Sequence, residues 1–272
     1  MRRLALSFAA AVLLAPAGAW ASACFGVSDA PAPPYASLVK KAQFAPGNLS
    51  EGEVGITFIG HATFRIETPQ GVIVATDYAG SSGPGPTPNV VTMNNAHETH
   101  FTDQIPSETV HTLRGWGDGE TPAAHEVRFR DMRIRNVTTD LLYGVRRVED
   151  GNSIFVFEVG DLCIGHLGHL HHLPTAEQFA QVGFLDVVFA PVDGVYTMSL
   201  DEMITTLKTL RARVVIPMHF WSTYSLTPFL DGMRDQFAVE IRDDPRLKAS
   251  KASLPDTATV VVLPMLNTPR FD

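Results

Sequence analysis

The sequence predicts an α/β domain in which two packed sheets are covered by helices. From residue 54 onward, apolar residues alternate with small or polar ones, as at Ile56 and Phe58 and again at Phe64 and Ile66. This period of two is typical of strands. In the second half, short apolar runs alternate with segments that carry helix-capping patterns. Strand-rich sections that each have helices later in their span favour two sheets with helices outside them.

Strands, a loop and helices are predicted along the chain from residue 54 onward. Strands are predicted at residues 54–58, 64–66, 72–75, 90–92, 110–113, 127–129, 132–137, 153–159, 162–164, 187–189, 214–216 and 259–263. Residues 79–89 are rich in Gly, Pro and Ser and predict a loop. Capping patterns predict helices over 174–182 and from Ser199 to about Leu210, and Thr227-Pro228 predicts the start of another.

The N-terminus has the three parts of a secretory signal peptide over residues 1–23. Arg2 and Arg3 form the basic start, residues 4–14 are apolar, and Ala21-Ser22-Ala23 supplies small residues for cleavage. The alternative is a buried N-terminal helix. The apolar run is too short to span a bilayer, and no later segment is long enough. We therefore expect an exported protein of the periplasm or cell envelope, with a leader over 24–52 and one domain over 53–272.

The two cysteines differ in their surroundings. Cleavage before Cys24 would make it the first residue, the position at which a bacterial envelope protein carries a lipid anchor. Ala21 is a poor match to the branched apolar residue usual in such proteins, so soluble export is favoured over a lipid anchor. Cys163 lies inside an apolar strand, and the pair predicts no disulfide framework.

The chain is acidic, with 21 basic and 29 acidic residues and a net charge of −8. Removing residues 1–23 takes away two arginines and no acids, which leaves 19 against 29 and a charge of −10. An acidic chain without a basic block argues against nucleic acid as the main partner. A small molecule is the expected partner, and no oligomeric state follows from the sequence.

Histidines at strand ends are the strongest functional signal. Gly165-His166-Leu167-Gly168-His169 ends one predicted strand, and Pro217-Met218-His219 ends another about fifty residues later. Imidazole is a common ligand for Zn and a good one for Fe, Ni and Cu. Histidines at separate strand ends predict a metal site if the sheet brings those ends together.

These motifs, with others in the same order, resemble the metallo-β-lactamase-fold superfamily. The closest resemblance is to its branch of small metal-dependent hydrolases that includes the ascorbate-6-phosphate lactonase-like proteins, and it runs from about residue 54 to the C-terminus. It is carried by Gly60-His61-Ala62-Thr63-Phe64, Asp77, Asn95-x-His97-x-Thr99-His100, residues 165–169, residues 191–198 and Pro217-Met218-His219. The resemblance implies a four-layer αββα sandwich whose strand-end loops hold one or two metal ions.

Such proteins usually bind metal through an HxHxDH loop, a later histidine, a bridging aspartate and a final histidine. Here Asn95, Thr99 and His169 stand where a histidine and two aspartates are expected. The resemblance implies metal ligands at His97, His100, His166, His169 and His219. His61 is a candidate catalytic residue or an additional ligand, and Thr99 is a second catalytic candidate. Asp77 is expected to orient the histidine loop.

The substitutions predict a single metal ion. A carboxylate can bridge two cations, whereas a neutral imidazole offers one nitrogen per metal. We expect Zn²⁺, with Mn²⁺ or Fe²⁺ as alternatives. An all-histidine site leaves more of the ion's charge to act on a bound water, so the altered motif is compatible with hydrolysis.

The expected function is therefore exported, metal-dependent hydrolysis of an ester, lactone, amide or phosphoester. Thr99 cannot titrate near neutrality, which keeps open a degenerate member that binds metal or ligand without turnover. A third reading is an envelope protein that stores metal through the histidines of residues 166–172. Tyr196 and Thr197 either build a turn or line the substrate pocket.

Overall fold

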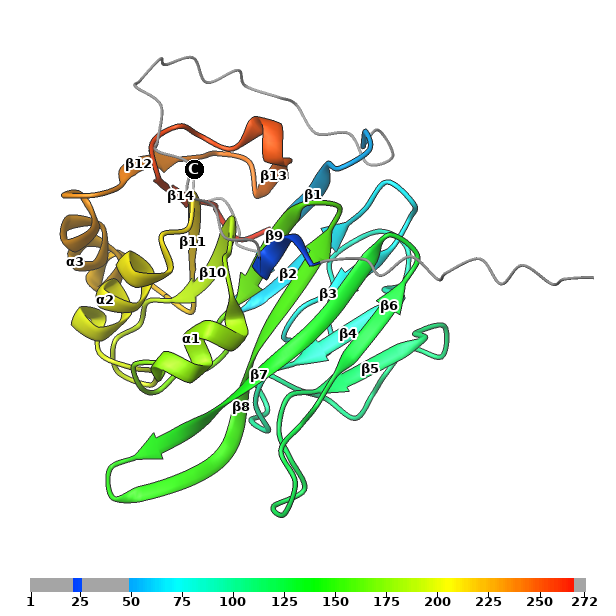
Figure 1. The fold of residues 1–272 in the computed structure, drawn as a ribbon, viewed down its shortest axis with the longest axis horizontal. Coiled ribbons are helices and arrows are strands. Elements are labelled where there is room, and N and C mark those ends of the chain that lie inside the picture. Colours follow the sequence, from blue (N-terminus) through cyan, green and yellow to red (C-terminus); the bar gives the residue numbers. More distant parts are fainter. Residues whose placement is uncertain (1–21, 26–48, 267–272) are drawn as a thin grey trace, which may run out of the picture.

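A computed structural model describes residues 22–25 and 49–266 (Figure 1). In these residues, fourteen strands form two sheets. The six-stranded sheet has the order β13 (Arg246–Ala249), β1 (Val54–Gly60), β2 (Thr63–Glu67), β3 (Ile73–Ala75), β4 (Val90–Met93) and β5 (His111–Arg114). The eight-stranded sheet has the order β12 (Ala238–Ile241), β14 (Thr259–Val262), β11 (Val214–Met218), β10 (Val187–Pro191), β9 (Leu162–His166), β8 (Arg146–Val159), β7 (Met132–Tyr143) and β6 (Glu126–Phe129).

The two sheets are held together by the apolar faces that the period of two predicts. Ile56, Phe58 and Phe64 of the six-stranded sheet are fully buried against residues of the eight-stranded sheet. The ring of Phe64 stacks on Phe58 at 4.6 Å and on Phe189 at 3.9 Å between centroids. Each such side chain contributes roughly 1.5 to 3 kcal/mol by burial. This core fixes the strand ends that carry the histidines.

Helices α1 (Ala176–Val182), α2 (Leu200–Leu210) and α3 (Thr223–Met233) pack against the eight-stranded sheet (Figure 1). Thr175 and Ser199 cap α1 and α2 as predicted. The side chain of Ser222 accepts the amide of Tyr224, so α3 begins a turn earlier than predicted and contains Pro228. The two-sheet α/β sandwich is confirmed.

The two sheets are covered differently in the described part of the chain. No α-helix there covers the six-stranded sheet. The outer face of β4 is instead covered by Phe101, Ile105 and Trp116, which pack with Val91 and Met93. Large side chains from loops can bury a strand face without a helix because apolar burial does not depend on direction.

The hairpin β7–β8 is much longer than the predicted strands. It projects as an arm from the sandwich (Figure 1). Its outer part mixes apolar and polar residues without a regular alternation, with Leu142 and Tyr143 exposed, so it lacks the period of two and was missed. Strands β12 and β13 were also missed, because each is short and only partly buried.

The expectation of no disulfide is wrong, because Cys24 and Cys163 are bonded to each other across 139 residues. The short 3-10 turn η1 (Ala23–Phe25) lies against β9, which carries Cys163. The amide of Phe184 donates to the carbonyl of Cys24 at 2.8 Å, and both sulfur-bearing side chains are buried. The two cysteines are far apart in the sequence, and only the folded sheet brings them into contact.

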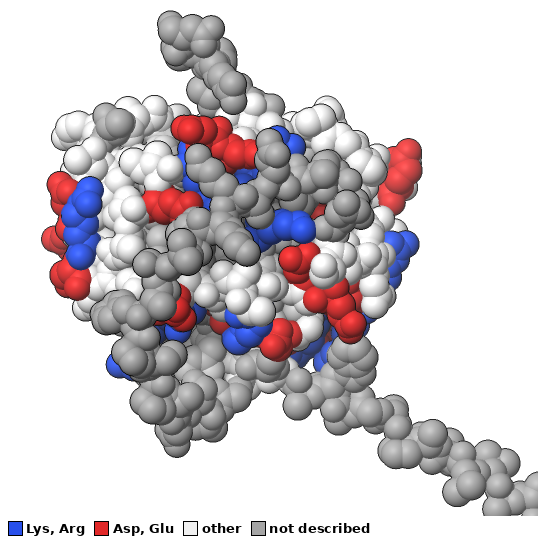
Figure 2. All heavy atoms as spheres, turned by 90° about the horizontal axis from the view of Figure 1, so that it is seen from above, with Lys and Arg blue, Asp and Glu red and all other residues white. Residues whose placement is uncertain are grey.

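The rest of the predicted signal peptide and most of the predicted leader, residues 1–21 and 26–48, lie outside the described residues. These boundaries remain predictions. Within the described residues, no helix is long and apolar enough to cross a membrane. Seen from above, acidic and basic side chains are interspersed among many uncharged ones (Figure 2).

The strand ends converge at one edge of the sandwich. Strands β9, β10 and β11 are parallel, so the loops that follow them leave from the same edge of their sheet. Strands β3 and β4 are also parallel to each other. The turn between β1 and β2 joins this edge, since the amide of His219 donates to the carbonyl of His61 at 2.8 Å. This bond ties the two sheets together where the histidines lie.

Candidate metal centre

Three histidines from three different loops meet at this edge. His61 lies in the β1–β2 turn, His100 in the loop after β4, and His219 directly after β11. One nitrogen of each ring lies within 4.8 Å of the others. The ring centroids of His61 and His219 are 4.2 Å apart, and those of His61 and His100 are 5.0 Å apart. Hereafter these three residues are called the histidine cluster.

The histidine cluster fits a metal ion by its hydrogen bonding. The Nε2 atoms of His61 and His100 are buried and have no hydrogen-bond partner in the described structure. A buried polar atom without a partner costs about 1 to 3 kcal/mol, so its lone pair needs a reason to be there. Imidazole nitrogens suit Zn, Cu, Fe and Ni. A cation of this kind would satisfy both atoms.

Two buried aspartates orient two of the rings. His100 Nδ1 hydrogen bonds Asp77 Oδ2, as the sequence predicted for Asp77. His219 Nδ1 bonds Asp193 Oδ1 at 2.9 Å. An aspartate on one ring nitrogen makes that nitrogen the donor and leaves the other lone pair for a metal, which is common around protein metal ligands. Sequence reasoning gave no role to Asp193, although it directly follows a strand in the same way as Asp77.

The backbone at the cluster is held in an unusual conformation. His61, Asp77 and His219 have φ angles of 52°, 46° and 57°, in the left-handed region that favours glycine. Such residues cost of order 1 to 3 kcal/mol each and persist only where the surroundings impose them. Three of them at one site indicate that the loops are shaped to aim these side chains.

Burial disfavours the charged form of two histidines at the site, His61 and His169. Burial lowers the pKa of His61 to about 4, and the neighbouring His219 and His100 add to the effect. Burial likewise lowers the pKa of His169, with His100 as the next cause. The carboxyl of Asp193 has a pKa below its usual range: burial opposes this, but the hydrogen bonds from His219 and Thr197 outweigh it. A neutral His61 ring close to the ionised carboxyl of Asp193 is suited to bind a cation.

The metal-free protein is therefore expected to lose stability on acidification. Between pH 6.5 and about 4, the unfolded chain takes up a proton at His61 that the folded chain does not, so the free energy of unfolding falls as the pH falls. Urea unfolding of chelator-treated protein at pH 7 and pH 4.5 should show a smaller loss for His61→Asn than for the parent. His97→Asn, at an exposed histidine, is the control. Equal losses in the parent and His61→Asn would contradict this account.

The structure brings some predicted ligands together and separates others. The ring of His169 lies 4.7 Å from His100 and 5.1 Å from His219, beside the cluster. Its Nδ1 pairs with His171 Nε2 at 2.7 Å. His97 is exposed, and its Nδ1 bonds Thr99 Oγ1 at 2.9 Å. His169 is therefore a neighbour of the cluster, whereas His97 points to solvent at its margin.

His166 has a different environment from the one that its motif implies. It is fully buried, and its Nε2 contacts the carbonyl of Ala62 at 2.7 Å. Its Nδ1 accepts the amide of Gly168 at 3.1 Å. Both ring nitrogens are thus used by the backbone, and the ring joins β9 to the β1–β2 turn. In this conformation His166 supports the histidine cluster and offers it no free nitrogen.

Asn95, which stands where the motif would have its first histidine, has a structural role as well. It is buried and forms an isolated bridge with Asn152 of β8. Its Nδ2 has no partner. Asn95 and His166 do not join the cluster, whereas His100 and His219 do.

A cavity of about 270 Å³ adjoins the cluster. His61 lines it with Thr99, so one side of the cluster opens to a space large enough for part of a substrate. The other lining residues are Ile59, Gly60, Thr63, Ala79, Ser81 and Met265. Both predicted catalytic residues, His61 and Thr99, therefore face the same space.

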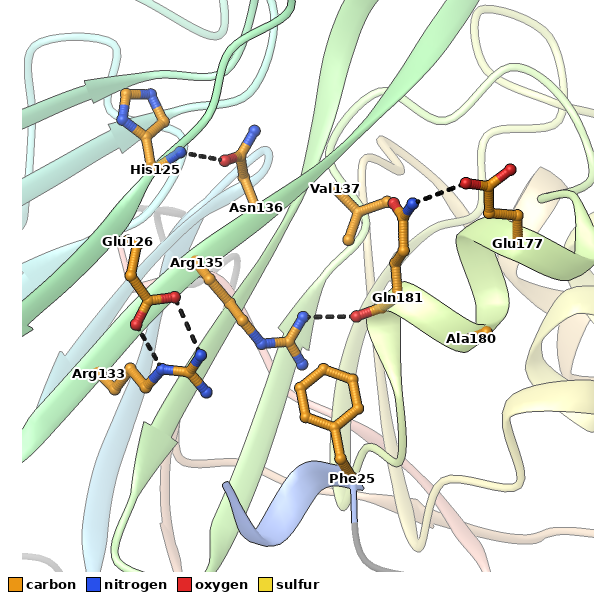
Figure 3. A pocket seen from close by; sticks show the side chains of 10 residues that line it. All are labelled: Phe25, His125, Glu126, Arg133, Arg135, Asn136, Val137, Glu177, Ala180 and Gln181. Atoms are coloured by element: carbon orange, nitrogen blue, oxygen red, sulfur yellow. Dashed lines mark hydrogen bonds and ion pairs between the residues drawn. The ribbon is translucent and has the colours of Figure 1, made fainter. Parts of the chain in front are cut away.

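A larger hollow of about 570 Å³ lies elsewhere, between α1 and strands β6 and β7 (Figure 3). Its cations are already paired: Arg133 bonds Glu126 and Glu158, and Arg135 bonds Glu158 and the carbonyl of Gln181. None of the histidine cluster lines it. Of these two spaces, only the smaller cavity is lined by a residue of the histidine cluster.

Comparison with known proteins identifies the family. A model of the β-lactamase superfamily domain matches residues 55–219, which is more than half of the chain. The chain belongs to the metallo-β-lactamase superfamily. The match begins at β1 and ends at His219, so it spans the histidine cluster. The metallo-β-lactamase resemblance predicted from the sequence is thereby confirmed.

Relatives within this superfamily are named as metal-dependent hydrolases. A UPF0173 metal-dependent hydrolase of Solibacter usitatus is 24% identical over 216 residues, covering 66% of this chain and 91% of the relative. One from Pyrococcus furiosus is 24% identical over 206 residues, covering 64% and 89%. The hydrolase class predicted from the sequence agrees with that of these relatives.

Solved structures agree. A protein from Thermotoga maritima, assigned to the Zn-dependent hydrolases of the metallo-β-lactamase superfamily, is 28% identical, with a TM-score of 0.57 over 77% of this chain and 98% of that chain. One from Parabacteroides distasonis, assigned to the metal-dependent hydrolases, is 15% identical with a TM-score of 0.54 over 67% and 89%, which shows the fold alone.

Proposed function

We propose that the protein is an exported hydrolase that uses one metal ion, held by His61, His100 and His219, on a small-molecule ester, lactone or amide. The observation that carries the proposal is the convergence of three imidazole nitrogens within 4.8 Å, two of them buried without any other partner. When bound, a divalent ion would lower the pKa of a water molecule and polarise the substrate's carbonyl oxygen.

The chain's own groups supply orientation and hydrogen bonds. Asp77 and Asp193 hold the Nδ1–H of His100 and His219, so neither ring can rotate away from the centre. His169, kept neutral by burial, presents a hydrogen-bonding ring beside the cluster. Thr99, at the cavity wall, can donate to or accept from a substrate oxygen. These groups bind and align a substrate at the open side of the cluster.

A single ion fits the way the carboxylates are used. Asp77 Oδ2 accepts a hydrogen bond from His100 Nδ1, and Asp77 Oδ1 accepts one from the amide of Asn94 at 3.0 Å. Both carboxylate oxygens are therefore engaged. Asp193 accepts His219 and backbone amides. Neither aspartate is free to bridge two cations, and His169 offers one nitrogen at most. The three-imidazole set suits Zn²⁺ and also accepts Fe²⁺, whereas Mn²⁺ prefers oxygen ligands.

Export is supported by the disulfide. Disulfides persist in oxidising compartments such as the bacterial periplasm and are rare in the cytosol. The Cys24 sulfur that bonds Cys163 cannot at the same time carry a lipid thioether. The pairing therefore favours soluble export after signal-peptide removal over a lipid-anchored form.

Metal content per chain tests the proposal. Protein purified without a histidine tag should hold about one tightly bound ion by elemental analysis, because the cluster has one set of free nitrogens. His100→Ala and His219→Ala should lose this ion, together with hydrolysis of a simple ester such as phenyl acetate. His97→Ala changes an exposed histidine of the same loop as His100 and should keep the ion.

Other outcomes identify the rival functions. An ion that is kept by the parent and lost in His219→Ala, with no hydrolysis of esters or phosphodiesters in either, would favour the non-catalytic binding protein. Several weakly held ions that persist in His219→Ala would favour metal storage by the histidines of 166–172. Two tight ions would refute the single-ion site.

A further inference from the structure

Two exposed aromatic side chains stand beside the histidine cluster. The ring centroid of Trp221 lies 5.6 Å from His61 and 5.1 Å from His219. Tyr196 meets Trp221 edge to face, with centroids 5.9 Å apart. The sequence raised Tyr196 as a pocket wall and gave no role to Trp221. Hereafter Trp221 and Tyr196 are called the aromatic pair.

The aromatic pair is unusual in its exposure. Trp221 is 62% exposed and Tyr196 is 65% exposed, although the neighbouring His219 is only 2% exposed. Val195, next to Tyr196, is 76% exposed. Single exposed apolar residues are common, but a contiguous group beside a polar site indicates a binding surface. The pair thus leaves ring surface open directly at the edge of the cluster.

The aromatic pair is built on the same framework as the cluster. The Oδ2 of Asp193 accepts the amides of Val195 at 2.9 Å and Tyr196 at 2.5 Å. Its Oδ1 orients His219, which lies two residues before Trp221. One buried carboxylate therefore fixes the position of a cluster histidine and of the loop that carries Tyr196. A binding surface needs this kind of rigid support to align a substrate with reacting groups.

The surroundings also constrain the charge of the ligand. None of the residues that line the adjoining cavity is a lysine or arginine. Arg65 lies two positions beyond Thr63 on the same strand, but it is 4% exposed and pairs with Glu67 at 3.3 Å. An anionic ligand group would find no accessible protein cation in this cavity, and the chain as a whole is acidic.

We infer that the aromatic pair binds the flat ring of an uncharged ester, lactone or amide and holds its carbonyl over the histidine cluster. Offset or edge-to-face contact between rings contributes about 0.5 to 1.5 kcal/mol beyond burial, which is roughly a 2- to 12-fold change in affinity. This inference deepens the proposed function and rests on it for the reaction, but not for the binding of the ring.

Binding of benzamide, a flat uncharged amide, to the protein as purified tests the inference. By calorimetry, Trp221→Ala should weaken benzamide binding about fivefold, whereas Trp221→Phe, which keeps a ring, should weaken it by less than about twofold. Cyclohexanecarboxamide, of similar size but not flat, should bind more weakly than benzamide to the parent. Phe184→Ala is the matched control, because Phe184 is 55% exposed and precedes β10, at the strand end opposite the cluster.

The outcomes separate this inference from the hydrolase proposal. If benzamide does not bind the parent, or if Trp221→Ala leaves its binding unchanged, the inferred ring binding by the aromatic pair is refuted, even if phenyl acetate is hydrolysed. If benzamide binding depends on Trp221 but no ester is hydrolysed, the inferred ring binding by the aromatic pair is supported and the proposed hydrolase activity is refuted. A kcat/KM for 4-acetoxybenzenesulfonate above that for phenyl acetate would overturn the preference for uncharged rings. Self-association that Trp221→Ala abolishes, with benzamide binding unchanged, would assign the pair to a subunit contact.

Discussion

Replacing Cys24 and Cys163 together by alanine is expected to lower the free energy of unfolding by about 4 to 5 kcal/mol. The bond closes a loop of 139 residues, and the entropy that such a closure removes from the unfolded chain grows slowly with loop length to values of this size. Denaturant unfolding of the mature protein and of the double variant, at equal metal content, measures the difference.

A reductant provides the control. Added to the parent, it should move the unfolding midpoint toward that of the double variant, and it should leave the double variant unchanged. The slope with denaturant should rise in the variant, because an uncrosslinked unfolded chain exposes more surface. Identical midpoints for parent and variant under oxidising conditions would show that the bond does not form in solution.

Asp193→Asn is expected to reduce metal affinity by roughly 10- to 100-fold, as losses of ligand-orienting carboxylates commonly do. Asp193 accepts hydrogen bonds from His219 Nδ1, from Thr197 Oγ1 at 2.6 Å and from the amides of the loop after β10. Asparagine replaces one carboxylate oxygen by an NH2 group, which would face some of these hydrogen-bond donors and cannot accept from them. Competition with a chromogenic chelator measures the affinity.

Asp186→Asn is the matched control for this change. Asp186 is also a buried aspartate, but it precedes β10 and pairs with Lys251 at 2.7 Å. Its loss should reduce stability and leave metal affinity within about twofold, because it lies at the other end of the strand and touches no cluster residue. Equal losses of affinity in both variants would mean that Asp193 acts through the fold and not through His219.

The architecture was predictable where burial sets the pattern. Strands such as β1 and β10 have one or both faces in an apolar core, so their composition reveals them. The outer half of the β7–β8 hairpin is held mainly by backbone pairing, and its apolar residues, such as Leu141 and Leu142, do not alternate regularly with polar ones. The disulfide escaped prediction because nothing near Cys24 or Cys163 in sequence indicates that η1 lies on β9.

The sequence predicted where the site lies better than it predicted which histidines offer a free nitrogen there. The strand-end histidines do converge, because parallel strands deliver their following loops to one edge. Motif spacing could not reveal that both nitrogens of His166 bond to backbone or that His97 faces solvent. Those outcomes depend on ring rotation, which is decided by tertiary neighbours. Trp221 has no sequence signal beyond its place just after His219.

The left-handed conformations of His61, Asp77 and His219 have a consequence for engineering. Glycine, and to a lesser degree asparagine, adopts these φ angles at lower cost. A library selected for heat resistance alone would therefore be drawn toward glycine or asparagine at the three positions most needed for metal binding. Heat-resistant variants would keep the α/β sandwich but lose the histidine cluster, unless each round of selection also required enzymatic activity.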